Sequence, residues 1–327
     1  PTPSENRISG KVAYQFKVIE DVDSIFLDAV NIDFSMVSLD GIKTDYDYNG
    51  KKITIKKEMK MGENHIVSID YVAKPKQTVY FLGWDDGVRN NEQVWTQGQG
   101  KYTSHWLPSF DDMTEKVEFD LDILLKEDYT VIANGNLVKK EALPDSDGYL
   151  WQFDMEEPMS SYLVGFAIGD YNKKTIESSS GVPIELYYEP TDFAKVEPTY
   201  RYTAHIFDFL ETEIGIPYPW QNYKQVPVQD FLYAGMENTT CTIFSNQYVI
   251  DSTAFVDKNY VNINAHELAH QWFGNLVTET SSEHHWLHEG FATYYAYLAE
   301  KDIFGDDYFY WHLLKTAQAL RNFSEDD

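Results

Sequence analysis

The sequence predicts a multidomain protein, with an all-β domain at residues 1–188 and an α+β domain at residues 189–327. Three observations support this division. Polar and apolar residues alternate through the first part, helical spacing replaces the alternation near residue 188, and 327 residues are enough for two domains with a sizeable core. The hydrophobic content of 43% indicates a globular chain rather than a disordered one. We expect the first domain to be sandwich-like.

Strands are predicted where residues alternate with a period of two or form a short apolar run. The segments with these patterns are residues 11–19, 52–56, 65–72, 149–153 and 162–168, and the last should be buried on both faces. The dipeptide Asn49-Gly50 lies between strand-like runs and is typical of a hairpin turn. Residues 130–137, which contain Asn134-Gly135, predict a second hairpin.

Helical patterns dominate the expected second domain. Apolar and aromatic residues recur at helical spacing over residues 194–214, where Gly215-Ile216-Pro217 ends the pattern. Two short strands are predicted at residues 225–228 and 242–244. Further helices are predicted at residues 260–273, with Gly274 as the stop, and at residues 286–301 and 308–321.

The helix predicted at residues 260–273 carries the motif His266-Glu267-Leu268-Ala269-His270. Side chains four residues apart project from one face of a helix, so His266 and His270 can point at one metal ion. Glu267 lies about 100° further round the helix, beside that ion. Glu289 follows His270 after 289 − 270 − 1 = 18 residues, on the next predicted helix, and can supply a third ligand. Two imidazoles and a carboxylate leave an open position on a tetrahedral zinc ion, as in a hydrolytic site.

These residue types suit zinc-assisted hydrolysis. Zinc acts as a Lewis acid and lowers the pKa of a bound water to about 7. Glu267 can take a proton from that water as a general base and pass it to a leaving amine. The alternative is an amphipathic helix with two buried or solvated histidines, and Glu289 at a workable spacing disfavours it.

Three more histidines, His284, His285 and His288, lie close to Glu289 in the sequence. Each is a conceivable ligand, and His285 could share the helix face of Glu289, four residues later. Because a catalytic zinc ion keeps only three protein ligands, we interpret these histidines as residues that support the ligands or lie at the surface. Glu283 is either a carboxylate that supports a ligand imidazole or a solvated acid at a helix start.

The chain is strongly acidic, with a net charge of −27, which argues against nucleic acid as a partner. Such a protein attracts cationic ligands such as peptide amino termini, although a generally acidic surface explains most of the charge. The single cysteine, Cys241, excludes internal disulfide bonds. No apolar run approaches membrane-spanning length and no signal peptide is visible. Because the chain starts at Pro1 without Met, removal of an N-terminal segment stays open, and the compartment is unknown.

Two further motifs accompany the histidine motif. Residues 233–238 read Tyr-Ala-Gly-Met-Glu-Asn, and residues 96–99 read Thr-Gln-Gly-Gln, followed by Trp-Leu-Pro-Ser-Phe-Asp at residues 106–111. With H-E-L-A-H and the segment W-L-H-E-G-F-A around Glu289, they resemble the zinc aminopeptidases of the aminopeptidase N and leukotriene hydrolase type, the gluzincin aminopeptidases. The corresponding family motifs are G-x-M-E-N, whose first glycine is Ala234 here, T-Q-x-E or S-Q-x-Q, and P-C-F-D.

The resemblance implies a thermolysin-like zinc peptidase domain with one zinc ion per chain and peptides with a free N-terminus as substrates. Glu237 would take the substrate's α-ammonium group with help from Gln99. Gly235 would let the backbone approach the substrate closely, and Tyr233 and Gln97 would form walls of the first side-chain pocket.

The resemblance also implies that some family features lie outside this chain. A tyrosine that donates a hydrogen bond to the developing oxyanion, and a helical C-terminal domain that closes the cleft, both follow the position that matches Asp327. We therefore expect the catalytic domain to be incomplete and the 327-residue chain to bind zinc but to turn over poorly. An epoxide hydrolase activity, found in one branch of the family, depends on residues beyond this chain.

Two rival functions stay open. One is a zinc endopeptidase that shares only the H-E-x-x-H helix, and cleavage of N-acetylated peptides would favour it. The other is a non-catalytic relative that serves as a binding module, and absence of stoichiometric metal would favour it. The sequence indicates neither the preferred N-terminal residue of a substrate nor the oligomeric state.

Overall fold

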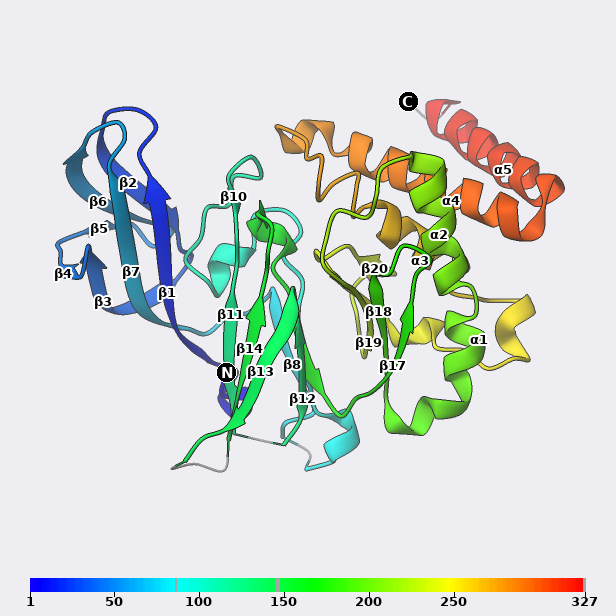
Figure 1. Cartoon of the computed structure of the whole chain (residues 1–327), viewed down its shortest axis with the longest axis horizontal. Coiled ribbons are helices and arrows are strands. Elements are labelled where there is room, and N and C mark those ends of the chain that lie inside the picture. Colours follow the sequence, from blue (N-terminus) through cyan, green and yellow to red (C-terminus); the bar gives the residue numbers. More distant parts are fainter. Residues whose placement is uncertain (86, 127, 145–147, 326–327) are drawn as a thin grey trace. The chain divides into compact units, whose positions relative to one another are not determined.

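A computed structural model describes residues 1–85, 87–126, 128–144 and 148–325. The chain forms two compact units, Pro1–Asp170 and Tyr171–Asp327. Strands and short 3₁₀ helices make up the regular structure of the first unit, whereas the α-helices of the described residues all belong to the second (Figure 1). The predicted order of a β part followed by an α+β part is therefore confirmed.

The first unit consists of antiparallel sheets. Its strands are β1 (Ile8–Lys17), β2 (Val22–Asp28), β3 (Ile32–Leu39), β4 (Ile42–Lys43), β5 (Asp47–Tyr48), β6 (Lys52–Met59), β7 (Asn64–Ala73), β8 (Val79–Leu82), β9 (Gln93–Thr96), β10 (Lys116–Val117), β11 (Leu121–Leu125), β12 (Thr130–Ala133), β13 (Asn136–Ala142), β14 (Tyr149–Asp154), β15 (Met159–Ser160) and β16 (Phe166–Gly169). The strand orders are β1-β7-β3-β4, β2-β6-β5, β12-β16-β9-β8, β11-β14-β13 and β10-β15. Alternation places apolar residues on one face, as in β7, where Val67, Ile69 and Tyr71 are buried.

Most of the predicted strands are present. Those predicted at residues 11–19, 52–56, 65–72 and 149–153 correspond to β1, β6, β7 and β14. The segment at residues 162–168 is buried throughout, as expected. However, the strand in this segment, β16, begins only at Phe166, because a 3₁₀ turn at Ser161–Leu163 precedes it.

The two predicted hairpins have different outcomes. Asn49-Gly50 joins β5 to β6, which pair antiparallel, so this hairpin is confirmed. The second predicted hairpin is wrong, because β12 pairs with β16 while β13 pairs with β14. Asn134 is buried in the passage between these two sheets. Its side chain accepts a hydrogen bond from the Gly165 amide at 2.7 Å and donates one to the Leu163 carbonyl at 3.1 Å, which fixes the crossing.

The second unit combines one mixed sheet with helices. Its elements are β17 (Asn172–Glu177), β18 (Pro183–Tyr188), α1 (Val196–Tyr200), α2 (Thr203–Ile214), β19 (Tyr223–Val228), β20 (Gly235–Met236), β21 (Cys241–Ser245), α3 (Val261–Ala269), α4 (Trp286–Phe304) and α5 (Asp306–Glu325). The strand order is β17-β18-β19-β21-β20, with β18, β19 and β21 parallel. The division between the units therefore differs from the boundary expected at residues 188 and 189, because β18 pairs with β19.

The helix predicted at residues 260–273 is shorter than expected. α3 ends at Ala269, because the amides of Gln271 and Trp272 bond to carbonyl groups only three residues back, at 3.0 and 3.1 Å. Gly274 follows this tighter turn with φ of +136°. The turn changes the direction of the chain immediately after His270, which is important for the site described below.

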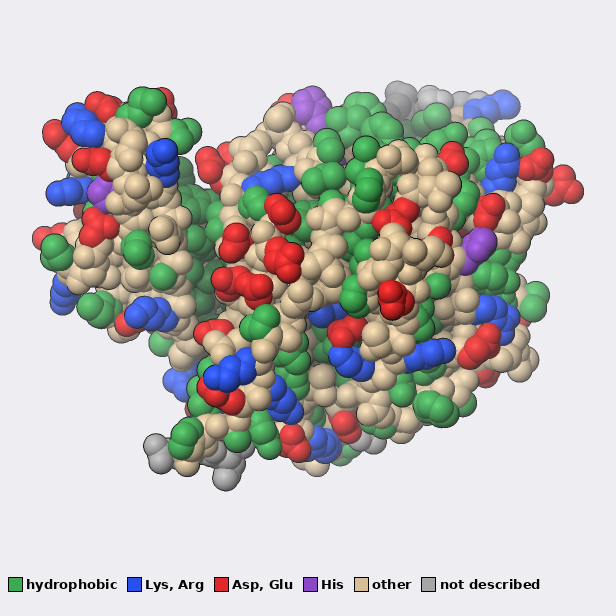
Figure 2. Space-filling view, in the orientation of Figure 1, with side chains coloured by type: hydrophobic (Ala, Val, Ile, Leu, Met, Phe, Trp, Pro, Cys, Tyr) green, Lys and Arg blue, Asp and Glu red, His purple; other side chains and the backbone are tan. Residues whose placement is uncertain are grey.

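The remaining predicted helices are present with adjusted bounds. The pattern at residues 194–214 divides into α1 and α2, and α2 ends before Gly215, as predicted. α4 and α5 extend beyond the ends predicted for them. No helix in the described part of the chain is both long and apolar enough to cross a membrane. Acidic side chains are spread over the face drawn in Figure 2, with Lys and Arg between them.

Candidate metal centre

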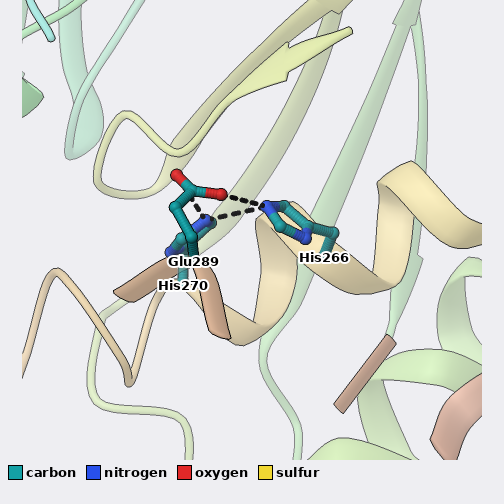
Figure 3. Close-up of side chains that lie close together, drawn as sticks. All are labelled: His266, His270 and Glu289. Carbon is teal, nitrogen blue, oxygen red and sulfur yellow. Dashed lines mark hydrogen bonds and ion pairs between the residues drawn. The ribbon is translucent and has the colours of Figure 1, made fainter. Parts of the chain in front are cut away.

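Three side chains predicted as metal ligands converge in the second unit. His266 lies on α3, His270 follows its last residue, and Glu289 lies in the first turn of α4 (Figure 3). His266 Nε2 lies 3.0 Å from His270 Nε2 and 3.3 Å from Glu289 Oε2, and His270 Nε2 lies 3.8 Å from Glu289 Oε1. Two atoms bound at about 2.0–2.1 Å by a tetrahedral ion are about 3.3 Å apart, so these three side chains are close enough to share one zinc ion.

Polar side chains on the rest of α3 hold the helix against its neighbours. The Asn264 side chain accepts a hydrogen bond from Gln225 Nε2 of β19 at 2.6 Å and donates one to Thr203 Oγ1 of α2 at 2.8 Å. Asn262 Nδ2 donates to Glu300 Oε2 of α4 at 2.8 Å. Because α3 is bonded to β19, α2 and α4, the two imidazoles project from a fixed support.

The turn after α3 orients the second imidazole. The Phe273 ring stacks on Phe291 and Tyr295 of α4, with ring centroids 4.9 and 5.0 Å apart. The backbone carbonyl of Phe273 accepts a hydrogen bond from His270 Nδ1 at 3.0 Å. A proton on Nδ1 leaves the lone pair of Nε2 available for a metal ion. Burial, together with the nearby His266, lowers the pKa of His270 to about 3. His270 is therefore neutral at pH 7, which is the form that binds metal.

Glu289 is more exposed than the two histidines predicted as ligands, with 43% of its side chain accessible. Hydrogen bonds from His266 and His285 lower the pKa of its carboxyl group well below the usual range. The carboxylate is therefore charged at neutral pH, as a metal ligand has to be.

Glu267 lies beside the ligand set and belongs to a second group of converging atoms. Its carboxylate, the carboxylate of Glu237 and the imidazole of His270 offer atoms within 4.8 Å of one another. Burial raises the pKa of Glu267 well above its usual value, and the charges of Glu237 and Glu289 raise it further. A divalent cation nearby favours the charged form instead. A carboxyl group in this environment suits proton transfer.

Gly235 of β20 packs directly on the Glu267 side chain. A Cβ atom at this glycine would lie 2.3 Å from Glu267 Oε1, 2.6 Å from Cδ and 2.7 Å from Cγ. Real Cβ atoms do not approach other heavy atoms so closely, so the Glu267 carboxylate occupies its position only beside a glycine. The sequence resemblance assigned Gly235 to close approach of a substrate, and the described contact is with Glu267.

Glu237 is buried beside the predicted metal ligands, 2% exposed, and its Oε1 makes no hydrogen bond among the described residues. Burial raises the pKa of Glu237 to about 7, and Glu289 contributes to the shift. Two amides hold the backbone of Glu237: its carbonyl accepts hydrogen bonds from Gln271 Nε2 at 3.1 Å and Asn275 Nδ2 at 2.8 Å. Sequence reasoning missed these two residues, although both closely follow the histidine motif.

The other predicted substrate-binding residues have varied surroundings. Tyr233 is 57% exposed in the loop before β20 of the second unit. Gln97 and Gln99 belong to the first unit, where Gln97 is buried and its Oε1 accepts a hydrogen bond from the Gln99 amide at 2.9 Å. Their roles in substrate binding stay predictions.

Sequence reasoning also missed Glu279, a carboxylate whose side chain is fully buried next to the centre. Its Oε1 lies 3.3 Å from His285 Nδ1, and its amide donates a hydrogen bond to His288 Nε2 at 2.8 Å. By contrast, Glu283 and His284 are exposed. The adjacent histidines in the sequence were a signal for a nearby acid, but nothing in the spacing identified Glu279.

Two family models match most of the chain. The Peptidase M1 N-terminal domain matches residues 1–163, and the Peptidase family M1 domain matches residues 199–327. Leucine aminopeptidase 2 of Yarrowia lipolytica is 29% identical over 302 residues, 89% of this chain and 44% of that protein. Glutamyl aminopeptidase of Bos taurus is 32% identical over 207 residues, which are 60% of this chain and 21% of that protein. Aminopeptidase N of Lactobacillus helveticus is 28% identical over 314 residues, which are 93% of this chain and 35% of that protein. The chain spans less than half the length of each.

The contact between Gly235 and Glu267 predicts a loss of stability for Gly235→Ala. The added methyl group has to displace a buried carboxylate, so the free energy of unfolding should fall by about 1–3 kcal/mol. Urea denaturation with a metal chelator present measures this change. Gly290→Ala is the matched control, because a Cβ atom there meets nothing within 4 Å, and it should cause no loss. Equal stability of the two variants would show that Glu267 can move aside freely.

Proposed function

The chain belongs to the M1 family of peptidases, and on this premise we propose that it is a zinc-dependent aminopeptidase that removes N-terminal residues from peptides. One zinc ion per chain is held by His266, His270 and Glu289. The observation that carries the proposal is that nitrogen and oxygen atoms of these three side chains lie 3.0–3.8 Å from one another. They lie beside the buried carboxylate of Glu237, whose Oε1 makes no hydrogen bond among the described residues.

The charges at the centre support two different cations. Glu289 raises the pKa of Glu237, and both of these carboxylates raise the pKa of Glu267. The other charged groups that act on Glu237 and Glu289 are histidines. A divalent metal ion and one ammonium group together supply three positive charges, which balance three carboxylates. A metal site alone would leave one buried carboxylate uncompensated. This balance favours a substrate with a free α-amino group.

Each of the chain's own residues then has a chemical role. A zinc ion bound at this position supplies Lewis acidity and a water molecule with a pKa of about 7. Glu267 accepts the proton of the attacking water and returns it to the leaving amine nitrogen. Gly235 keeps the Glu267 carboxylate in place, since any larger residue would displace it. His270 stays neutral and directs Nε2 toward the metal, because its Nδ1 donates to the Phe273 carbonyl.

Glu237 binds the α-ammonium group of the substrate through a charge-assisted hydrogen bond. Its carboxylate lies close to His270 and Glu267, so an amine bound there brings the first peptide bond near the metal centre. Gln99 assisting the amine, and Tyr233 and Gln97 lining the first side-chain pocket, are proposed from the resemblance of their motifs alone.

Replacing the general base should separate metal binding from turnover. In Glu267→Gln the ligand set is intact, so the variant should retain one zinc ion per chain, measured by elemental analysis. Its kcat should fall by about 10²–10⁴-fold, because the amide cannot accept the proton. Loss of zinc from the variant would instead identify Glu267 as a ligand, and full activity would remove it from the proposed role.

Replacing the amine-binding carboxylate should affect substrates with a free N-terminus. Glu237→Ala removes a buried charge-assisted contact worth about 1.5–3 kcal/mol, so KM for such peptides should rise roughly 10- to 150-fold, while zinc content stays near one per chain. Glu177→Ala, which changes an exposed acid of β17, is the control.

The same substrates distinguish the rival activity. Acetylation of the peptide N-terminus removes the ammonium charge, so an aminopeptidase should stop cleaving the peptide. Continued cleavage of the acetylated peptide would favour a zinc endopeptidase, and a chain without stoichiometric zinc would favour a binding module. Unchanged KM in Glu237→Ala would exclude Glu237 as the amine ligand.

A further inference from the structure

A second cluster of potential ligands lies beside the proposed zinc site. Glu279, His285 and His288 offer atoms within 4.8 Å of one another. Glu279 and His288 are buried, with 0% and 4% of their side chains exposed, whereas His285 is partly exposed, at 36%. The cluster contacts the first site, because His285 Nε2 lies 3.4 Å from Glu289 Oε1. Its composition fits either a second metal site or a support for Glu289.

The hydrogen bonds of His288 argue against a second metal. The backbone amide of Glu279 donates to His288 Nε2 at 2.8 Å, so the neutral imidazole carries its proton on Nδ1. That nitrogen faces Glu279 Oε2 at 3.8 Å. His288 therefore directs a proton, not a lone pair, toward the cluster. Because His288 lies on α4, the same hydrogen bond ties the loop that contains Glu279 to this helix and fixes the position of the Glu279 carboxylate.

His285 connects this fixed carboxylate to the proposed zinc ligand. Its Nδ1 lies 3.3 Å from Glu279 Oε1, and its Nε2 lies 3.4 Å from Glu289 Oε1. The other oxygen of Glu289 faces His266 Nε2 at 3.3 Å. Glu289 Oε1 also lies 3.8 Å from His270 Nε2, so His285 contacts an oxygen that faces one of the two proposed ligand histidines, while the other oxygen faces the second histidine. His285 is also the residue that immediately precedes α4, so the helix start and this connection are fixed together.

We propose that His285, oriented by Glu279, is a positioning residue that holds Glu289 in the geometry required of a metal ligand. This inference rests on the proposed function, since it assumes that Glu289 binds zinc. Glu289 is the most exposed of the three proposed ligands, and ordering an exposed side chain costs conformational entropy when it binds. The bond to His285 orders it in advance. Residues that orient ligands in this way typically change metal affinity 10–100-fold when they are replaced.

The test is the zinc affinity of the whole 327-residue chain, measured by competition with a chromophoric chelator. His285→Ala should raise the Kd for zinc by about 10–100-fold. His284→Ala, which changes the exposed neighbouring histidine, should leave the Kd unchanged. Thermal unfolding of the metal-free variants checks that each is folded. A Kd in His285→Ala equal to that of the unaltered chain would overturn the proposal.

Two further measurements separate positioning from general structural support. In His285→Gln an amide N–H can still donate to Glu289 Oε1, so most of the affinity should return. The visible absorption of the Co²⁺-loaded chain should change in His285→Ala, because the coordination of Glu289 changes, and should be restored in His285→Gln. An equal loss of affinity in both variants would show that the donor to Glu289 is not what matters, and the proposal would fail.

Glu279→Gln keeps the test decisive if His285→Ala does not fold. This variant retains an oxygen acceptor for His285 but removes the negative charge of the Glu279 carboxylate. The Kd for zinc should therefore rise, although less than in His285→Ala. An unchanged Kd would overturn the role of Glu279 and His285. If the unaltered chain itself bound no zinc, the proposed function would fail. If the unaltered chain bound zinc and the variants bound it equally well, only the role of His285 and Glu279 would fail.

Discussion

The burial of like charges is the constraint on which the site depends. The carboxylates of Glu237, Glu267 and Glu289 meet around two imidazoles, and the first two are almost completely buried. Burial and mutual repulsion raise the pKa values of Glu237 and Glu267. Such an arrangement lowers the free energy of unfolding in a protein that binds no cation, so elements outside the site have to hold it together.

The chain holds these groups with neutral hydrogen bonds. Asn264 ties α3 to the sheet and to α2, and the amides of Gln271 and Asn275 hold the carbonyl of Glu237. An amide orients its partner without adding charge, so it leaves the carboxylates free to interact with a cation. The histidine at the start of α4 differs, because it joins two carboxylates, Glu279 and Glu289. It contacts the one proposed ligand that solvent reaches most easily.

Local rules predicted the parts of the structure that depend on neighbouring residues. Four-residue spacing brought His266 and His270 together, and alternation identified β7. Where distant segments decide, the sequence was insufficient. The turn at Asn134 joins two sheets because each flanking strand finds a partner elsewhere, and β18 belongs to the second unit because β19, 35 residues later (223 − 188 = 35), pairs with it. Glu279 was missed for the same reason, since its environment depends on where α4 packs.

The buried carboxylate of Glu237 also bears on how a substrate would be selected. If Glu237 binds the substrate's amine, as proposed, a peptide with a free amino terminus would neutralise this carboxylate and satisfy its oxygen atoms. A peptide with a blocked terminus, or an internal segment of a longer chain, would cover the same carboxylate with neutral atoms and leave it uncompensated. The energetic penalty of that mismatch exceeds the gain from one ordinary hydrogen bond, because the charge has already lost its water. Selectivity in such a site arises mainly from the cost of the wrong ligand, and a site built around a polar contact rejects ligands without it more strongly than an apolar pocket can.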